Sequence, residues 1–117
     1  MPNIPININN VIEEFVKRTN EILGNRVKKI ILYGSYARGD YNKGSDIDIM
    51  ILTDLTEDEM YKNFVEISDM AYDLEEENNF DIMLSPLLKN IDRFNYWLEA
   101  LPFYINVARE GVVLSES

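Results

Sequence analysis

Cysteine and histidine are both missing from this chain of 117 residues. The absence of cysteine excludes disulfides and thiolate metal sites, and it removes the usual reason to expect an oxidising compartment. The absence of histidine excludes a serine or cysteine nucleophile activated by an imidazole, and any imidazole-bound zinc. Any chemistry must therefore be carried out by carboxylates, hydroxyls, amines and the backbone.

Basic residues are scarce, with 11 Lys and Arg against 21 Asp and Glu and a formal net charge of −10. Binding to long nucleic acids depends on basic side chains that displace counterions from phosphates, so DNA or RNA is not expected as a partner. A small nucleotide accompanied by magnesium is compatible with this charge, because the metal supplies the positive charge that the protein lacks.

Long apolar runs are missing too, and no segment approaches the thickness of a bilayer. Residues 1–10 lack the basic start and the continuous apolar run of a secretory signal. We therefore expect a cytoplasmic protein with no membrane partner. The length fits a single domain over residues 1–117, since domains cluster near roughly 100 to 150 residues, and 46% hydrophobic residues can supply its core.

The hydrophobic pattern predicts alternating helices and strands. The expected helices run from Asn9 or Asn10 to Leu23, from the capping box at 56–59 to Asn78, over 91–98, and from Pro102 to Arg109. The expected strands cover 27–33, 46–53 and 80–84, with Pro86 ending the third and a short apolar tail at 112–114. This order predicts an α/β (α+β) fold with a small mixed sheet backed by helices.

Two aspartates, Asp46 and Asp48, open the second predicted strand. Residues two apart on a strand point the same way, with Cα atoms roughly 6.5 to 7 Å apart, so their carboxylates can converge on ions between them. Hard oxygen ligands favour magnesium or manganese, and two such ions roughly 4 Å apart can clamp an in-line phosphoryl transfer. A third carboxylate is expected from Asp81, near the start of the next strand, as metal ligand or base. The alternative is a purely structural pair at the strand edge, which the cost of burying unpaired carboxylates disfavours.

A Gly-Ser pair, Gly34 and Ser35, closes the first predicted strand. Glycine at this position lets a phosphate approach the backbone, and a serine that opens a helical turn offers a hydroxyl and amides to anionic oxygens. Such pairs are common in turns. The pair gains weight because ten residues separate it from Asp46.

Together these motifs resemble the minimal nucleotidyltransferases of the polymerase-beta-like superfamily, whose pattern is Gly-Ser, about ten residues, then Asp-X-Asp. Residues 34–48 match that pattern without a gap, and the resemblance extends over roughly residues 28–114. The richer form, Gly-Ser-X-Ala-Arg-Gly ending in Ser-Asp-X-Asp, is matched through Ala37, Arg38, Gly39 and Ser45. The resemblance implies a polymerase-beta-like nucleotidyltransferase fold.

Short members of this family, the MNT proteins, are often antitoxins paired with a helical HEPN-domain toxin, which is an RNase. The resemblance therefore implies transfer of AMP from ATP to a tyrosine hydroxyl of such a toxin, with two Mg²⁺ ions. The metal ligands and catalytic residues implied are Asp46, Asp48 and Asp81, and the nucleotide-binding residues are Gly34, Ser35, Arg38 and Ser45.

Two other functions stay open. The chain could neutralise its partner by complex formation without catalysis, or it could adenylylate a small molecule of the aminoglycoside type. It has little room for an added helical domain that would bind a small acceptor, although a homodimer could also frame such a site.

Two segments carry weaker expectations of a partner surface. Residues 54–77 contain ten acidic residues and one lysine, which we expect to form a solvated helix face, with docking of a basic partner as the alternative. The aromatic-rich residues 94–104 are expected mainly to pack two short helices, with a partner surface as the alternative.

Overall fold

The structure is a computed structural model that describes residues 3–117. Met1 and Pro2, the start of the segment in which no secretory signal is expected, lie outside the described residues. In chain order the elements are α1 (Ile6–Leu23), the 3₁₀ turn η1 (Gly24–Arg26), β1 (Val27–Tyr33), α2 (Ser35–Arg38), β2 (Ile47–Thr53), α3 (Glu57–Glu77), β3 (Leu84–Asn90), α4 (Ile91–Trp97), α5 (Pro102–Glu110) and β4 (Val112–Glu116).

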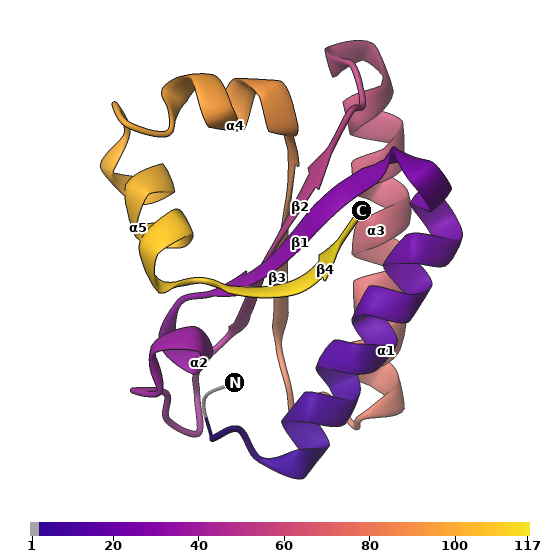
Figure 1. The fold of residues 1–117 in the computed structure, drawn as a ribbon. Coiled ribbons are helices and arrows are strands. Elements are labelled where there is room, and N and C mark those ends of the chain that lie inside the picture. Colours follow the sequence, from indigo (N-terminus) through magenta and orange to yellow (C-terminus); the bar gives the residue numbers. More distant parts are fainter. Residues whose placement is uncertain (1–2) are drawn as a thin grey trace.

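The four strands form one mixed sheet in the order β3-β2-β1-β4. β1 pairs antiparallel with both β2 and β4, whereas β2 and β3 run parallel. Helices lie on both faces of this sheet (Figure 1): α1 and α3 lie side by side on one face, and α4 and α5 lie on the other. The expected fold class, a small mixed sheet backed by helices, is confirmed.

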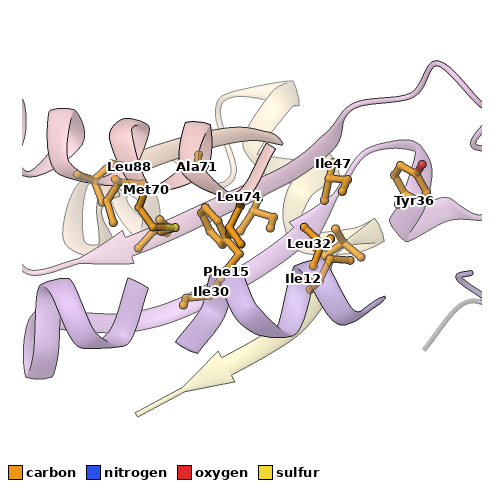
Figure 2. Close-up of a cluster of buried hydrophobic side chains, with 14 of the residues drawn as sticks. Ile12, Phe15, Ile30, Leu32, Tyr36, Ile47, Met70, Ala71, Leu74 and Leu88 are labelled. Atoms are coloured by element: carbon orange, nitrogen blue, oxygen red, sulfur yellow. The ribbon is translucent and has the colours of Figure 1, made fainter. Parts of the chain in front are cut away.

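The larger core lies between the sheet and the α1–α3 pair. Phe15 of α1 is fully buried there and packs beside Leu74 of α3 and Ile30 of β1 (Figure 2). A smaller cluster on the opposite face consists of Ile31, Met50, Leu52, Phe94 and Val107. Two hydrophobic layers of unequal size therefore hold the helices to the sheet.

β2, which carries Asp48, alternates as its sequence predicts. Ile47, Ile49 and Ile51 belong to the larger core on the α1–α3 face. Met50 and Leu52 belong to the smaller cluster on the α4–α5 face. Because successive strand residues point to opposite faces, Asp48 faces the α4–α5 side.

α1 begins earlier than predicted, at Ile6 rather than after Asn9 or Asn10. Pro5 serves as the N-cap, and its carbonyl accepts a hydrogen bond of 3.0 Å from the backbone N–H of Asn9. Proline is well tolerated at a helix start because its missing N–H would have no intrahelical partner there. The added turn buries Ile8 in the larger core.

The third strand was predicted wrongly at 80–84. Asn79 and Phe80 both have positive φ (58° and 56°) in the turn after α3, so the strand starts only at Leu84. It then runs through Pro86, which was expected to end it. β3 lies at the edge of the sheet. The N–H of Ile47 donates to the carbonyl of Met83, so Met83 and every second residue after it turn their backbone groups toward β2. Pro86 belongs to the alternate set, and its nitrogen therefore faces the open edge. Proline therefore removes no hydrogen bond from the sheet.

The acidic and aromatic segments combine internal packing with exposed groups. Acidic residues of 54–77 form ion pairs across the fold, namely Asp54 and Glu59 with Arg26, Glu57 with Arg93, and Glu77 with Arg18. In the segment 94–104, Phe94 is buried against Tyr104, whereas Tyr96 and Trp97 are exposed. Within the described residues 3–117, no helix is both long enough and apolar enough to traverse a bilayer.

Candidate functional site

A cavity of about 360 Å³ collects four of the predicted site residues. It lies where β1 ends and β2 begins, since Tyr33 pairs with Asp48 across these antiparallel strands. Its lining consists of Tyr33, Gly34, Ser35, Arg38, Asp48, Phe103, Asn106, Val107 and Glu110. The Gly-Ser turn and the second aspartate of Asp-X-Asp therefore meet in one place, as their pattern predicts.

The contact between Gly34 and Asp48 defines the centre of this site. Gly34 has φ 79° and ψ −156°, a backbone conformation that only glycine adopts readily. A Cβ atom at this position would collide with Oδ2 of Asp48. The bare Cα of Gly34 therefore lets the Asp48 carboxylate lie directly against this turn.

The environment of Asp48 disfavours its negative charge. Burial raises the pKa of Asp48 above its ordinary value, the charge of Asp46 raises it further, and the charge of Arg38 partly opposes this. Asp46 is exposed, precedes β2 by one residue and does not line the cavity. Asp46 and Asp48 are a donor set that a hard divalent cation fits, because the cation would offset both negative charges.

Arg38 is the basic side chain of the cavity. Its Nε donates to Oδ2 of Asp40 at 3.2 Å, and its Nη1 donates to Oε2 of Glu110 at 3.5 Å. All three side chains are partly exposed, so these pairs are weak and exchangeable. The guanidinium is therefore available to a phosphate group that enters the cavity.

Ser45, predicted as a nucleotide-binding residue, stabilises the loop before β2. Its hydroxyl oxygen accepts a hydrogen bond of 2.9 Å from the backbone N–H of Asn42, and its own N–H donates to the carbonyl of Asn42 at 3.1 Å. Ser45 does not line the cavity. Its position two residues before β2 indicates that it shapes the approach to Asp46 rather than the floor of the site.

Asp81 does not join the other two aspartates. It is exposed in the loop three residues before β3, and it lines a different cavity with Tyr36, Tyr41 and Lys43. Among residues 3–117, no three acidic side chains form a group placed to hold a metal ion. The expectation of a carboxylate on the third strand is thus wrong in its placement, because that strand begins later than the sequence pattern indicates.

Sequence reasoning missed the wall that α5 contributes to the cavity. This wall consists of Phe103, Asn106, Val107 and Glu110. Phe103 packs edge-on against Tyr33, with ring centroids 5.6 Å apart. Burial, helped by the charge of Asp48, raises the pKa of Tyr33 to about 12, so its phenol is neutral. No sequence spacing relates α5 to the Gly-Ser turn about seventy residues earlier. The one sequence signal for this part of the site is Glu110 and Gly111 before the last strand, which the resemblance to the family includes.

Comparison with solved structures shows the same fold elsewhere. A structure described as a putative nucleotidyltransferase from Sulfolobus solfataricus has a TM-score of 0.63 at 18% identity, covering 95% of this chain and 82% of that one. A structure described as a toxin-antitoxin with AMP-PNP has a TM-score of 0.52 at 19% identity, covering 90% and 73%. At these identities the similarity establishes the fold alone.

Sequence comparison establishes the family. Residues 12–111 match the family described as nucleotidyltransferase domain. The chain is also 35% identical over 109 residues to "Putative protein adenylyltransferase MJ0604" of Methanocaldococcus jannaschii, covering 93% of this chain and 99% of that protein. The chain therefore belongs to the nucleotidyltransferase domain family and is a minimal nucleotidyltransferase.

Proposed function

We propose that this chain transfers AMP from ATP to a tyrosine hydroxyl of a HEPN-type toxin and thereby acts as its antitoxin. The observation that carries the proposal is the contact of Gly34 with Asp48, which places the turn suited to phosphates directly beside a carboxylate suited to a metal ion. The description of MJ0604 as a protein adenylyltransferase supports a protein as acceptor. The toxin-antitoxin structure with AMP-PNP supports ATP and a toxin partner.

The residues of the site divide into two roles in this proposal. Asp46 and Asp48 would hold Mg²⁺, which would offset the negative charge of the phosphates. Gly34 and Ser35 would contact the triphosphate, and Arg38 would neutralise part of its charge. Asp46 lies outside the cavity lining but its charge acts on Asp48, whereas Asp81 and Ser45 neither line the cavity nor act on Asp48, so these two are left out of these roles.

The proposed reaction is an in-line displacement at the α-phosphorus of ATP. The tyrosine oxygen forms a bond to the α-phosphorus. The bond between the α-phosphorus and the oxygen that bridges it to the β-phosphorus breaks. Pyrophosphate leaves with the bridging oxygen. The hydroxyl proton passes to solvent water, to which the carboxylate of Asp46 is exposed. The products are an AMP-tyrosine phosphodiester and pyrophosphate.

The test uses ATP labelled at the α-phosphate, Mg²⁺ and a purified HEPN-type protein from the neighbouring reading frame. Wild-type protein is expected to transfer label to the partner. The double variant Asp46→Asn with Asp48→Asn is expected to lose transfer, whereas Asp69→Asn with Asp73→Asn on the exposed face of α3 removes the same charge and is expected to retain it. Replacement of the modified tyrosine by phenylalanine should abolish labelling.

Other outcomes select the other functions. Transfer that persists in the Asp46 and Asp48 double variant contradicts the catalytic assignment. Tight complex formation without labelled partner supports neutralisation by occlusion. Pyrophosphate release with an aminoglycoside and no partner protein supports a small-molecule adenylyltransferase.

A further inference from the structure

A groove of about 650 Å³ lies outside the candidate functional site, around the edge strand β3. Residues 87–90 of β3 form its floor. α3 forms one wall and α4 with α5 forms the other, since these helices lie on opposite faces of the sheet (Figure 1). The groove therefore wraps around the edge of the sheet that no described strand covers.

Large apolar side chains that remain open to solvent dominate the walls. Tyr61 is 79% exposed, Trp97 43% and Phe64 39%, and Met60 and Tyr104 line the groove beside them. The cores of protein interfaces are enriched in tyrosine, tryptophan, phenylalanine and methionine, whereas free surfaces rarely gather them in one place. The composition of this groove fits a protein partner.

The groove adjoins the cavity of the candidate functional site through α5. Phe103 lines that cavity, whereas the next residue, Tyr104, lines the groove, and the centroids of their rings are 5.9 Å apart. A polypeptide seated in the groove is therefore held beside the catalytic cavity, as a protein acceptor has to be.

The edge strand favours a helix over a strand as the occupant. The nitrogen of Pro86 faces the edge and has no proton to donate, so an added strand would form an interrupted ladder. A helix satisfies its own backbone, and a helix is one of the usual covers of a sheet edge. Apolar walls contributed by two helices suit the apolar face of an amphipathic helix.

The charge on the α3 wall indicates a basic occupant. In the lining itself, Arg93 is already paired with Glu57. A second copy of this chain would bring two acidic α3 helices together, each in a chain of net charge −10. Complementary charge therefore selects a different protein with basic groups toward α3. Residues 54–77 hold six acidic side chains that form no ion pair among residues 3–117, namely Asp58, Glu66, Asp69, Asp73, Glu75 and Glu76.

We propose that this groove docks an amphipathic helix of the protein acceptor, with apolar side chains on Tyr61, Phe64 and Trp97 and with lysine or arginine toward α3. The inference rests on the proposed function, because it names where the acceptor is held. It also gives one role to two segments that the catalytic cavity leaves largely unused, since 54–77 and 94–104 supply opposite walls of the same groove.

The first test uses Trp97, the only tryptophan of the chain, which makes fluorotryptophan a label for the groove alone. Fluorine NMR is recorded with and without an unlabelled HEPN-type protein from the neighbouring reading frame. Docking is expected to shift the Trp97 resonance and to reduce its solvent isotope shift between H₂O and D₂O. Binding measured by calorimetry that leaves the Trp97 resonance unchanged overturns the inference.

The second test measures the affinity and the association rate of the same partner. Tyr61→Ala and Trp97→Ala are each expected to weaken binding about tenfold or more, as truncation of aromatic anchors does. Tyr72→Ala is the matched control, because this exposed tyrosine of α3 contacts Phe80 and does not line the groove, and its affinity should match wild type. Association should slow by about tenfold as sodium chloride rises from about 0.05 to about 0.5 M.

The groove and the proposed function fail in different ways. Partner binding at wild-type affinity in both Tyr61→Ala and Trp97→Ala overturns the groove and leaves the proposed function intact, and salt-independent association contradicts the basic flank. A homodimer that Tyr61→Ala dissociates would assign the groove to a second copy and overturn the inference. Wild-type protein that binds no partner contradicts the proposed function itself.

Label transfer separates docking from an indirect effect on the catalytic cavity. Tyr61→Ala is expected to raise KM for the acceptor while kcat and binding of a non-hydrolysable ATP analogue stay near wild type, since docking contributes equally to ground and transition states. A lowered kcat with unchanged KM overturns the docking role. Thermal unfolding of each variant verifies that it is folded at the temperature of the assay.

Discussion

Gly34 meets two constraints at once, a backbone conformation with positive φ and a close approach to Asp48. Gly34→Ala imposes a Cβ in a backbone region open mainly to glycine and pushes it into the Asp48 carboxylate. We expect a stability loss of roughly 1–3 kcal/mol from the backbone alone. We also expect nucleotidyl transfer to fall by about 100-fold, because a small displacement of a catalytic group has effects of this size.

The matched control for this substitution is Gly39→Ala. Gly39 also has a positive φ, 91°, but a Cβ there would meet no atom within 4 Å. It should therefore lose stability by about 1 kcal/mol while its transfer rate stays near that of wild type. Equal rate losses in the two variants, measured at a temperature where both are folded, would show that the collision with Asp48 is not what limits activity.

Asp48 is expected to reduce the stability of the fold that carries it. Its pKa is raised above the ordinary 3.8, so the folded protein binds this proton more tightly than the unfolded chain, and stability decreases as the pH rises through that window. Asp48→Asn should therefore raise the melting temperature at pH 7, on the order of a few degrees. Differential scanning calorimetry should show the gain disappearing as the pH falls below 3.8.

The exposed Asp69→Asn on α3 provides the comparison for Asp48→Asn. A gain of the same size in both variants would attribute the effect to the net charge of −10 rather than to the site.

The limits of sequence reasoning about the site are visible at single residues. The pairing of Gly34 with Asp48 follows from local pattern, because a strand end and a strand start with fixed spacing must meet in an antiparallel pair. The role of Asp81 depended on where β3 begins, and that start is set by two positive-φ residues that are not glycine. Glu110 enters the cavity through tertiary packing, which no short-range pattern encodes.

At the level of elements, Glu59 joins the start of α3 to the turn before β1. One carboxylate oxygen accepts from the backbone N–H of Thr56 at 3.0 Å, and both accept from Arg26. The hydrogen bonds from Arg26, followed by those from Thr56, lower the pKa of Glu59 from 4.5 to about 2. A carboxylate with a lowered pKa stabilises the fold above its unfolded pKa and loses this effect as it is protonated.

We therefore expect Glu59→Gln to lower the melting temperature at pH 7. The difference from wild type should vanish as the pH falls from 4.5 to about 2. Asp58→Asn, one position earlier and without an ion pair among the described residues, should show no such pH-dependent difference. Circular dichroism melts across this range make the comparison, and a Glu59→Gln deficit that persists at pH 2 would indicate packing rather than charge.

Sequence reasoning identified most helices and strands because their signals are local. The capping box at Thr56 correctly placed the start of α3, and the unbroken apolar run of β1 correctly indicated a central strand. Pro86 misled the prediction because proline is excluded from central strands but tolerated at an open edge. Which strand lies at the edge is a property of the whole sheet and is absent from any window of sequence.

For the whole molecule, the unequal cores predict unequal local stability. Twenty buried residues hold α1 and α3 to the sheet, whereas five form the cluster under α4 and α5. Segments with fewer buried contacts open at lower free energy. Hydrogen exchange should therefore be faster for amides of α4 and α5 than for those of α1, β1 and β2.

Nucleotide binding should change this exchange pattern selectively. α5 supplies Phe103, Asn106 and Glu110 to the cavity, so a nucleotide with Mg²⁺ is expected to slow exchange in α5 and to leave α1 unchanged. Uniform protection of both helices would indicate global stabilisation by the ligand rather than ordering of the cavity wall.

Pro86 has a consequence beyond its own strand. An open sheet edge offers unpaired backbone groups to any passing strand, and a second copy of the same chain is the most abundant source of such strands during synthesis. On β3 the proline nitrogen faces that edge, so the row of donors is interrupted near its middle. Pro86, which led the sequence pattern to predict too early an end to this strand, therefore protects the protein against edge-to-edge aggregation. Pro86→Val is the substitution expected to remove that protection.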